Sequence, residues 1–308
     1  MLFLLFLFLC TQCTLTQSKR QLPPGNIIIA YVDNCDDSGA QALAEARAGV
    51  NVLIWSFISN LDNNQVHFDL DSNCIAQVAK TLREEHLPTT HLVSIGGWDA
   101  PHPNTTIAGE EWWTVIKQWN RDIISKPALN FSGFDGIDWD LEGNDTPTSQ
   151  WNMFTQKTLD LMGTLSKAAH DDGFIVTLVP PESYFDVTTS SYDRSLTHPY
   201  PEPWHPEFLY HGRNVYTYLL AKYSLEIFDL IDIQLYESYS HATYYIDQVY
   251  VLIVIILFLG AFFFECLLCN HNFRNKTQTN DNILTFFYTI SLFLLQHNNT
   301  LLSLSLSV

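Results

Sequence analysis

Six short apolar runs alternate with longer segments of helical spacing, and this alternation limits the possible folds more than any other feature of the chain. The apolar runs occupy residues 26–34, 50–58, 91–98, 134–142, 174–181 and 228–237. Between them, apolar residues recur every three or four positions over residues 41–48, 72–85, 110–124, 149–170 and 214–226. Because strands that alternate with helices form βαβ units, the sequence predicts an α/β protein with a parallel sheet.

The fourth apolar run decides between an open and a closed parallel sheet. Its residues Asp138, Asp140 and Glu142 are spaced by two, so they share one face of a strand, while the large apolar residues between them share the other. In a doubly wound sheet both faces pack on helices, and a central strand is apolar on both. The acidic face therefore predicts a (β/α)8 TIM barrel, whose interior opens to solvent at one end.

Three other interpretations of the acidic run use fewer of its residues. A solvated edge strand would alternate in this way, although apolar runs on both sides in the sequence argue against an edge position. A calcium loop counted from Asp138 needs Glu at its twelfth position, where this chain has Ser149. A D-x-D metal site of a sugar transferase would use Asp138 and Asp140 but leaves Glu142 without a role.

A catalytic interpretation uses all three acids. Carboxylates this close together cannot all ionise at neutral pH, so at least one has a raised pKa and holds a proton. Glu142 is the last of the three and lies nearest the C-terminal mouth of a barrel, where substrates bind. A protonated carboxyl at that position supplies the proton that a glycosidic oxygen needs to leave as an alcohol.

Three short motifs make this interpretation specific. "DGIDWDLE", residues 135–142, resembles the D-G-x-D-x-D-x-E signature of glycoside hydrolase family 18, the chitinases and endo-β-N-acetylglucosaminidases. "SIGGW", residues 94–98, resembles that family's S-x-G-G motif on the third strand, and "QLY", residues 234–236, resembles its sixth-strand motif. The similarity spans roughly residues 26–240 and implies a substrate of chitin or other N-acetylglucosamine glycans, with no cofactor and no metal.

The resemblance also implies a role for each acid and for the "QLY" motif. Glu142 would be the catalytic acid and later the base. Asp140 would orient the 2-acetamido group of the substrate and stabilise its charge, and Asp138 would lie behind it and tune that charge. Tyr236 would donate a hydrogen bond to the acetamido oxygen, and Gln234 would line the same subsite.

Aromatic residues add candidate positions for stacking against the flat faces of sugar rings. Residues 180–210 form a segment too long and too rich in Tyr, Trp and Pro for a plain connector, and we expect it to overhang the mouth of the barrel. Its Tyr184 and Trp204, with Trp98 and Tyr31, are the candidate substrate-binding aromatics. Three further tryptophans have helical spacing and are predicted to pack in the interior: Trp112, Trp113 and Trp119.

The ends of the chain differ in composition from its middle. Residues 1–17 have the form of a secretory signal peptide, and residues 21–248 hold six barrel strands and the predicted catalytic domain. Residues 249–268 are apolar enough to be a candidate transmembrane helix, and residues 269–308 form a low-complexity tail. Strands seven and eight of a barrel are missing, so the barrel is predicted to be incomplete at its C-terminal end.

The net charge of the chain and its expected secretion limit the classes of molecule that it can bind. The net charge of −18, with no clustered Lys or Arg, argues against nucleic acid. The signal-like segment predicts a secreted protein, possessing a membrane anchor if residues 249–268 span a bilayer. Secretion permits a disulfide between Cys35 and Cys74, the two cysteines of the globular part, although two buried thiols are the alternative. It also permits glycosylation at the sequons of Asn104, Asn130 and Asn144.

Taken together, the residues and the resemblance predict a family 18 hydrolase, most simply a chitinase, that retains the β configuration. In the geometry that the resemblance implies, Asp140 faces the substrate's 2-acetamido group, so the acetamido oxygen, rather than a second carboxylate, is expected to attack C1. Two alternatives remain: a non-catalytic carbohydrate-binding lectin of the same fold, and a truncated, inactive product. Glu142 favours the enzyme because such lectins typically lack the acid.

Overall fold

The six apolar runs form six parallel strands that are neighbours in the sheet in the same order as in the sequence. The computed structural model describes residues 20–35, 37–186, 189–197, 212–236, 290–296 and 300–306. The parallel strands are β1 (Ile28–Val32), β2 (Val52–Asp62), β4 (Thr90–Gly97), β5 (Gly136–Leu141), β6 (Ile175–Leu178) and β7 (Leu230–Ile231). A short strand, β3 (Gln65–Phe68), pairs antiparallel with the end of β2.

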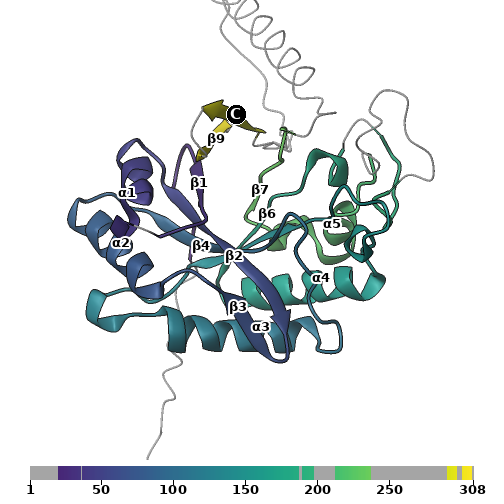
Figure 1. Ribbon diagram of the computed structural model, residues 1–308, viewed down its shortest axis with the longest axis horizontal. Helices are drawn as coiled ribbons and strands as arrows, with labels where there is room; N and C mark the ends of the chain where they lie inside the picture. Colours follow the sequence, from purple (N-terminus) through teal and green to yellow (C-terminus); the bar gives the residue numbers. More distant parts are fainter. Residues whose placement is uncertain are drawn as a thin grey trace, which may run out of the picture.

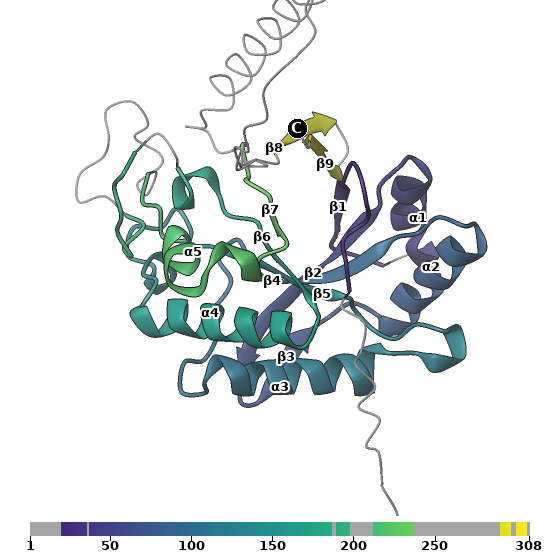
Figure 2. The same cartoon turned by 180° about the vertical axis from the view of Figure 1, so that it is seen from behind.

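Helices lie on the outer side of this curved sheet, which is an open half-barrel (Figures 1 and 2). They are α1 (Ala40–Arg47), α2 (Ser72–Glu84), α3 (Gly109–Trp119), α4 (Gln156–Asp171) and α5 (Thr217–Tyr223). Each falls within or next to a segment of predicted helical spacing. Among the described residues no parallel strand follows β7, so the prediction of an α/β barrel incomplete at its C-terminal end is confirmed.

The larger apolar core lies between the outer face of the sheet and the helices. Trp139 points outward from β5, is fully buried, and its Nε1 donates a hydrogen bond of 2.8 Å to the hydroxyl of Ser166 on α4. Trp112 and Trp113 are buried in the same core, as their spacing predicts, and Trp119 is half-buried. Burial of such large side chains contributes about 2–3 kcal/mol each to folding. The acidic residues of β5 consequently face the inside of the half-barrel.

The strand β5 is not an edge strand. It lies between β4 and β6, pairs parallel with both, and all six of its residues are buried. The interpretations of the acidic run as a solvated edge or as a calcium loop are therefore wrong, because both need its residues in water or in a loop.

The tail supplies two strands that the sequence does not predict. β9 (Thr300–Leu306) pairs antiparallel with β1, opposing Ile28 to Leu304, and β8 (Ile290–Gln296) pairs with β9. Leu and Ser alternate near the end of β9, which is the period of a strand. β9 thus bonds to the edge of β1 that an eighth parallel strand would occupy in a closed barrel.

Two further predictions concern the termini and the cysteines. The signal-like residues 1–17 and the candidate transmembrane residues 249–268 lie outside the described residues. Within the described part of the chain, no helix has the length and apolar character needed to cross a membrane. Cys35 and Cys74 form a disulfide with a Cα–Cα distance of 6.0 Å, which confirms the predicted pairing and ties the end of β1 to the first turn of α2.

Candidate active site

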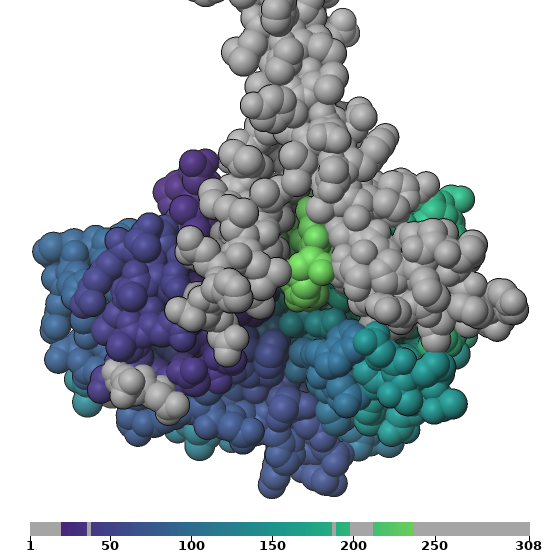
Figure 3. All heavy atoms as spheres, turned by 45° about the horizontal axis from the view of Figure 1, so that its top comes forward, coloured from purple at the N-terminus to yellow at the C-terminus, as the bar shows by residue number. Residues whose placement is uncertain are grey.

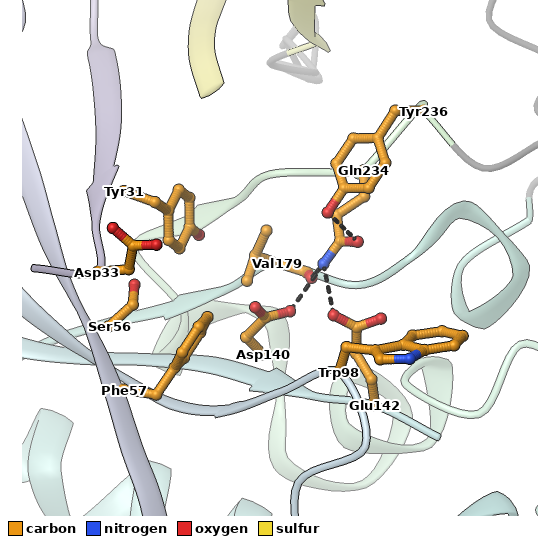
Figure 4. Close-up of a pocket in the computed structure, with 10 residues that line it drawn as sticks. All are labelled: Tyr31, Asp33, Ser56, Phe57, Trp98, Asp140, Glu142, Val179, Gln234 and Tyr236. Atoms are coloured by element: carbon orange, nitrogen blue, oxygen red, sulfur yellow. Dashed lines mark hydrogen bonds between the residues drawn. The ribbon is translucent and has the colours of Figure 1, made fainter. Parts of the chain in front are cut away.

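A pocket of about 230 Å³ opens at the carboxyl ends of the parallel strands. In the space-filling view of Figure 3, the light-green residues of the region of β7 lie between the purple and blue N-terminal part of the chain and its teal part. Figure 4 shows the ten residues that line the pocket: Tyr31, Asp33, Ser56, Phe57, Trp98, Asp140, Glu142, Val179, Gln234 and Tyr236. Residues far apart in the sequence thus meet at one end of the half-barrel.

The two glycines of the "SIGGW" motif let β4 lie close to its neighbours, Gly96 to β5 beside Asp140 and Gly97 to Phe57 of β2. Gly96 has a φ of +118°, and a Cβ at this position would lie 2.5 Å from the backbone oxygen of Asp140. Gly97 has a φ of +92°, and a Cβ there would lie 3.2 Å from the ring of Phe57. Only glycine fits the first position without moving the strand that carries the acids.

Three hydroxyl groups surround Asp138, deep in the half-barrel. Its Oδ2 accepts hydrogen bonds from the Tyr31 hydroxyl at 3.1 Å and from Ser94 Oγ at 2.8 Å, and its Oδ1 accepts one from Thr177 Oγ1 at 2.5 Å. These donors come from β1, β4 and β6. Burial raises the pKa of Asp138 to about 6, although all three hydrogen bonds act in the opposite direction. Above that pH, Asp138 is a fixed negative charge behind Asp140.

Gln234 connects the other two acids. Its Nε2 donates to Asp140 Oδ1 at 2.7 Å, lies 3.4 Å from Glu142 Oε1, and also donates to the Val179 carbonyl at 2.9 Å. Its Oε1 accepts a hydrogen bond of 2.7 Å from the Tyr236 hydroxyl. The "QLY" motif therefore meets the acidic strand as the sequence predicts.

The acid pair keeps a proton at neutral pH. Burial raises the pKa of Glu142 to about 7. Burial, followed by the charges of Glu142 and Asp138, raises the pKa of Asp140 well above its usual range. Two neighbouring carboxyls with raised pKa values share one proton near pH 7 because double ionisation would place two unpaired charges side by side.

Backbone contacts fix the loop that carries Glu142. The carbonyl of Gly143 accepts a hydrogen bond of 3.1 Å from the amide of Asp99, and the amide of Gly143 donates one of 2.8 Å to the hydroxyl of Tyr184. The Tyr216 hydroxyl bonds both the amide and the carbonyl of Leu141 at 2.9 Å. Tyr184 and Tyr216 thus hold the end of β5 from behind.

Of the four predicted substrate-binding aromatic residues, two line the pocket, one is buried away from it, and one lies outside the described residues. Trp98 lines the pocket with 51% of its side chain exposed, and Tyr31 also lines it. The expectation that Tyr184 binds substrate is wrong, because its ring is fully buried and its hydroxyl is bonded to Gly143. Trp204 lies outside the described residues.

Four pocket residues were not predicted as site residues: Asp33, Ser56, Phe57 and Val179. One of them had a usable signal. Asp33 follows Tyr31 by two positions, so both lie on the face of the first strand that points into the half-barrel. The other three could not be found from sequence alone, since nothing distinguishes them from core residues of the same runs.

The three sequons differ in accessibility. Asn130 is exposed, and Asn104 is half-buried with its amide nitrogen 2.9 Å from Asp62 Oδ1. The side chain of Asn144 is buried, and its Nδ2 donates to Asp99 Oδ1 and, at 2.8 Å, to Ser149 Oγ. The amide group at 144 that a glycan would need is therefore engaged in the folded protein.

Comparison with known proteins gives similarity at the level of solved structures. No protein-family model matches the chain, and no sequence among the curated proteins matches it. A chitinase from Chromobacterium violaceum is 14% identical, covering 70% of this chain and 57% of its own, with a TM-score of 0.39. Human YKL-39, described as a pseudo-chitinase with retained chitooligosaccharide binding, is 18% identical, covering 53% and 45%, with a TM-score of 0.37. The ICChI chitinase from Ipomoea carnea is 15% identical, covering 69% and 68%, with a TM-score of 0.39. The chain thus spans about half the length of the first two.

Proposed function

We propose that this protein is a glycosidase of the family 18 type that hydrolyses β-1,4-N-acetylglucosamine linkages in chitin or chitooligosaccharides. One observation carries the proposal. Two buried carboxyls with raised pKa values, Asp140 and Glu142, share a pocket wall and one amide donor from Gln234. The motif resemblance of residues 94–98, 135–142 and 234–236 supports it.

Glu142 has the properties of a general acid. Its pKa of about 7 leaves it protonated in mildly acidic solution, and it lies on the pocket wall beside the exposed ring of Trp98 (Figure 4). A sugar that stacks on Trp98 would place the glycosidic oxygen next to this carboxyl. Proton transfer to that oxygen then lets the bond to C1 break without forming an alkoxide.

The placement of the two acids argues against an enzyme nucleophile. Asp140 and Glu142 belong to one strand, and one Gln234 nitrogen reaches both. They are neighbours on one wall, whereas an ordinary retaining glycosidase places its two carboxyls on opposite sides of the scissile bond. We assign Asp140 to the 2-acetamido group instead.

The reaction that fits this arrangement uses the substrate's own acetamido oxygen. That oxygen forms a bond to C1 as the glycosidic bond breaks, and the departing oxygen takes the proton of Glu142. The resulting oxazolinium ion is positive, and the Asp140 carboxylate stabilises it. Water then attacks C1 as the bond from C1 to the acetamido oxygen breaks, and it gives a proton to the Glu142 carboxylate, so the acetamido group is restored and the product keeps the β configuration.

The disulfide supports an extracellular location as part of the same proposal. Cys35 and Cys74 are bonded, and stable disulfides are typical of oxidising compartments. A secreted enzyme would meet chitin or N-acetylglucosamine glycans directly.

A Glu142→Gln variant tests the proposal, because glutamine keeps the shape of the side chain but has no carboxyl proton to donate. Release of reducing ends from an N-acetylglucosamine hexamer should fall about 100- to 10,000-fold, while hexamer binding measured by calorimetry persists. Equal binding with no turnover in either protein would identify a lectin instead. Absence of both, together with no cooperative unfolding transition, would identify an inactive product.

A further inference from the structure

Asp33 is an acid of the pocket that the proposed reaction does not use. It follows β1, is exposed, and lines the same pocket as the acid pair. In Figure 4 it lies on the wall with Tyr31, while Glu142 and Trp98 lie on the opposite side and Asp140 lies between. Among the described residues, no Lys, Arg or His forms a salt bridge with Asp33. A carboxylate open to the pocket, without a cation from the described chain, suits a cationic ligand.

We propose that Asp33 binds the protonated amino group of a glucosamine unit, so that the preferred substrate is partially N-deacetylated chitin. This inference rests on the function proposed above and adds its substrate class. The chemical reason is that an ionised carboxylate only accepts hydrogen bonds. A sugar ammonium offers three donors and a positive charge, whereas an acetamido group offers one donor and a carbonyl oxygen that the carboxylate repels.

The order of residues along the pocket assigns this amine to one particular sugar. In the proposed reaction, Glu142 lies next to the leaving oxygen, and Asp140 lies next to the acetamido group of the reacting sugar. Asp33 and Glu142 lie on opposite sides of Asp140 (Figure 4). The amine therefore belongs to the sugar that precedes the reacting one, on the side away from the leaving group. The reacting sugar itself must keep its acetyl group, so fully deacetylated chitosan is not cleaved.

The overall charge favours the same substrate class. A net charge of −18 attracts a cationic polymer over a distance set by the Debye length, which is about 8 Å at physiological salt. Neutral chitin gains nothing from this field. Added salt should therefore slow hydrolysis of the partially deacetylated polymer more than hydrolysis of the neutral hexamer.

The test compares Asp33→Asn with Asp69→Asn, an exposed acid outside the pocket that loses the same charge. For each protein, kcat/KM is measured on half-acetylated chitosan and on the N-acetylglucosamine hexamer. The ratio of the two values should fall about fivefold in Asp33→Asn and stay constant in Asp69→Asn. Mass-spectrometric sequencing of wild-type products should show acetylated new reducing ends preceded by an excess of glucosamine, and Asp33→Asn should remove that excess.

One control keeps this inference separate from the proposed function. Binding of both ligands to Glu142→Gln, with and without Asp33→Asn, repeats the comparison where hydrolysis is switched off. If the wild-type protein cleaves or binds the hexamer but Asp33→Asn leaves the ratio and the product pattern unchanged, this inference is wrong and the proposed function stands. If the wild-type protein neither binds nor cleaves either ligand, both are wrong.

Discussion

Ser94 Oγ donates a hydrogen bond of 2.8 Å to Oδ2 of Asp138, across the pairing of β4 with β5. With the hydroxyls of Tyr31 and Thr177, it holds a negative charge close to Asp140. That charge contributes to the raised pKa of Asp140, so the three hydroxyls that hold Asp138 influence the protonation of the acid pair.

The first prediction concerns this buried charge. An Asp138→Asn variant removes it, which should lower the pKa of Asp140 and weaken the hold of the acid pair on its shared proton. Hydrolysis by the wild-type protein should decline as pH rises through about 7, where Glu142 loses its proton. In the variant this decline should begin at lower pH. Profiles of kcat/KM against pH, which report groups of the free enzyme, measure the shift, and a shift to higher pH would contradict the role given to Asp138.

The second prediction concerns stability and needs no activity. The pKa of Glu142 is raised from 4.5 to about 7 in the folded protein, so the stability linked to this group is complete below about pH 4.5 and is lost as pH rises through 7. Glu142→Gln does not titrate. Relative to the wild-type protein, the variant should gain about 3 kcal/mol in unfolding free energy between pH 4 and pH 8, measured by urea denaturation. If the difference in unfolding free energy between the two proteins is the same at pH 4 and at pH 8, Glu142 has an ordinary pKa.

The third prediction concerns the approach of β4 to β5. Gly96→Ala places a methyl group 2.5 Å from the Asp140 backbone oxygen and should cost on the order of 3 kcal/mol. Gly25→Ala is the matched control, because Gly25 also has a positive φ, of +88°, but nothing lies within 4 Å of its Cβ position. That variant should cost only about 1 kcal/mol. If the two variants lose the same unfolding free energy in chemical denaturation, the positive φ alone, and not the contact with Asp140, explains the cost at Gly96.

The fourth prediction concerns the disulfide. Cys35 and Cys74 are 39 residues apart, and closing a loop of that length stabilises the folded state by about 4 kcal/mol in the chain-entropy model. The double variant Cys35→Ser, Cys74→Ser should lose about this amount. Because Cys35 lies two residues from Asp33, loss of the disulfide should also reduce the preference for partially deacetylated substrate. Hydrolysis of the N-acetylglucosamine hexamer should be affected less. Equal stability of the two proteins would contradict the pairing.

Periodicity alone was enough to predict the sheet, its outer helices and the acidic wall of the site. Alternation by two places Asp138 and Asp140 on one face of β5, whatever the rest of the chain does. The buried position of Tyr184 was not predictable, since its partner Gly143 is 41 residues away and only the folded chain brings them together. The pairing of β9 with β1 joins residues at opposite ends of the chain, and local spacing carries no information about such a contact.

Because Gln234 follows the acids in the sequence, the site is completed only late in synthesis of the chain. Gln234 lies 94 residues after Asp140, just past a strand of two residues that is the last parallel one described. At ribosomal speeds of about 5–20 residues per second, the acids emerge roughly 5–20 s before the amide that joins them. Until β7 docks, that side of the sheet would be open to water, and the burial that raises both pKa values would be incomplete. The nascent chain would therefore carry its reactive acid in an inert form and acquire the proton-sharing pair only when the last parallel strand arrives.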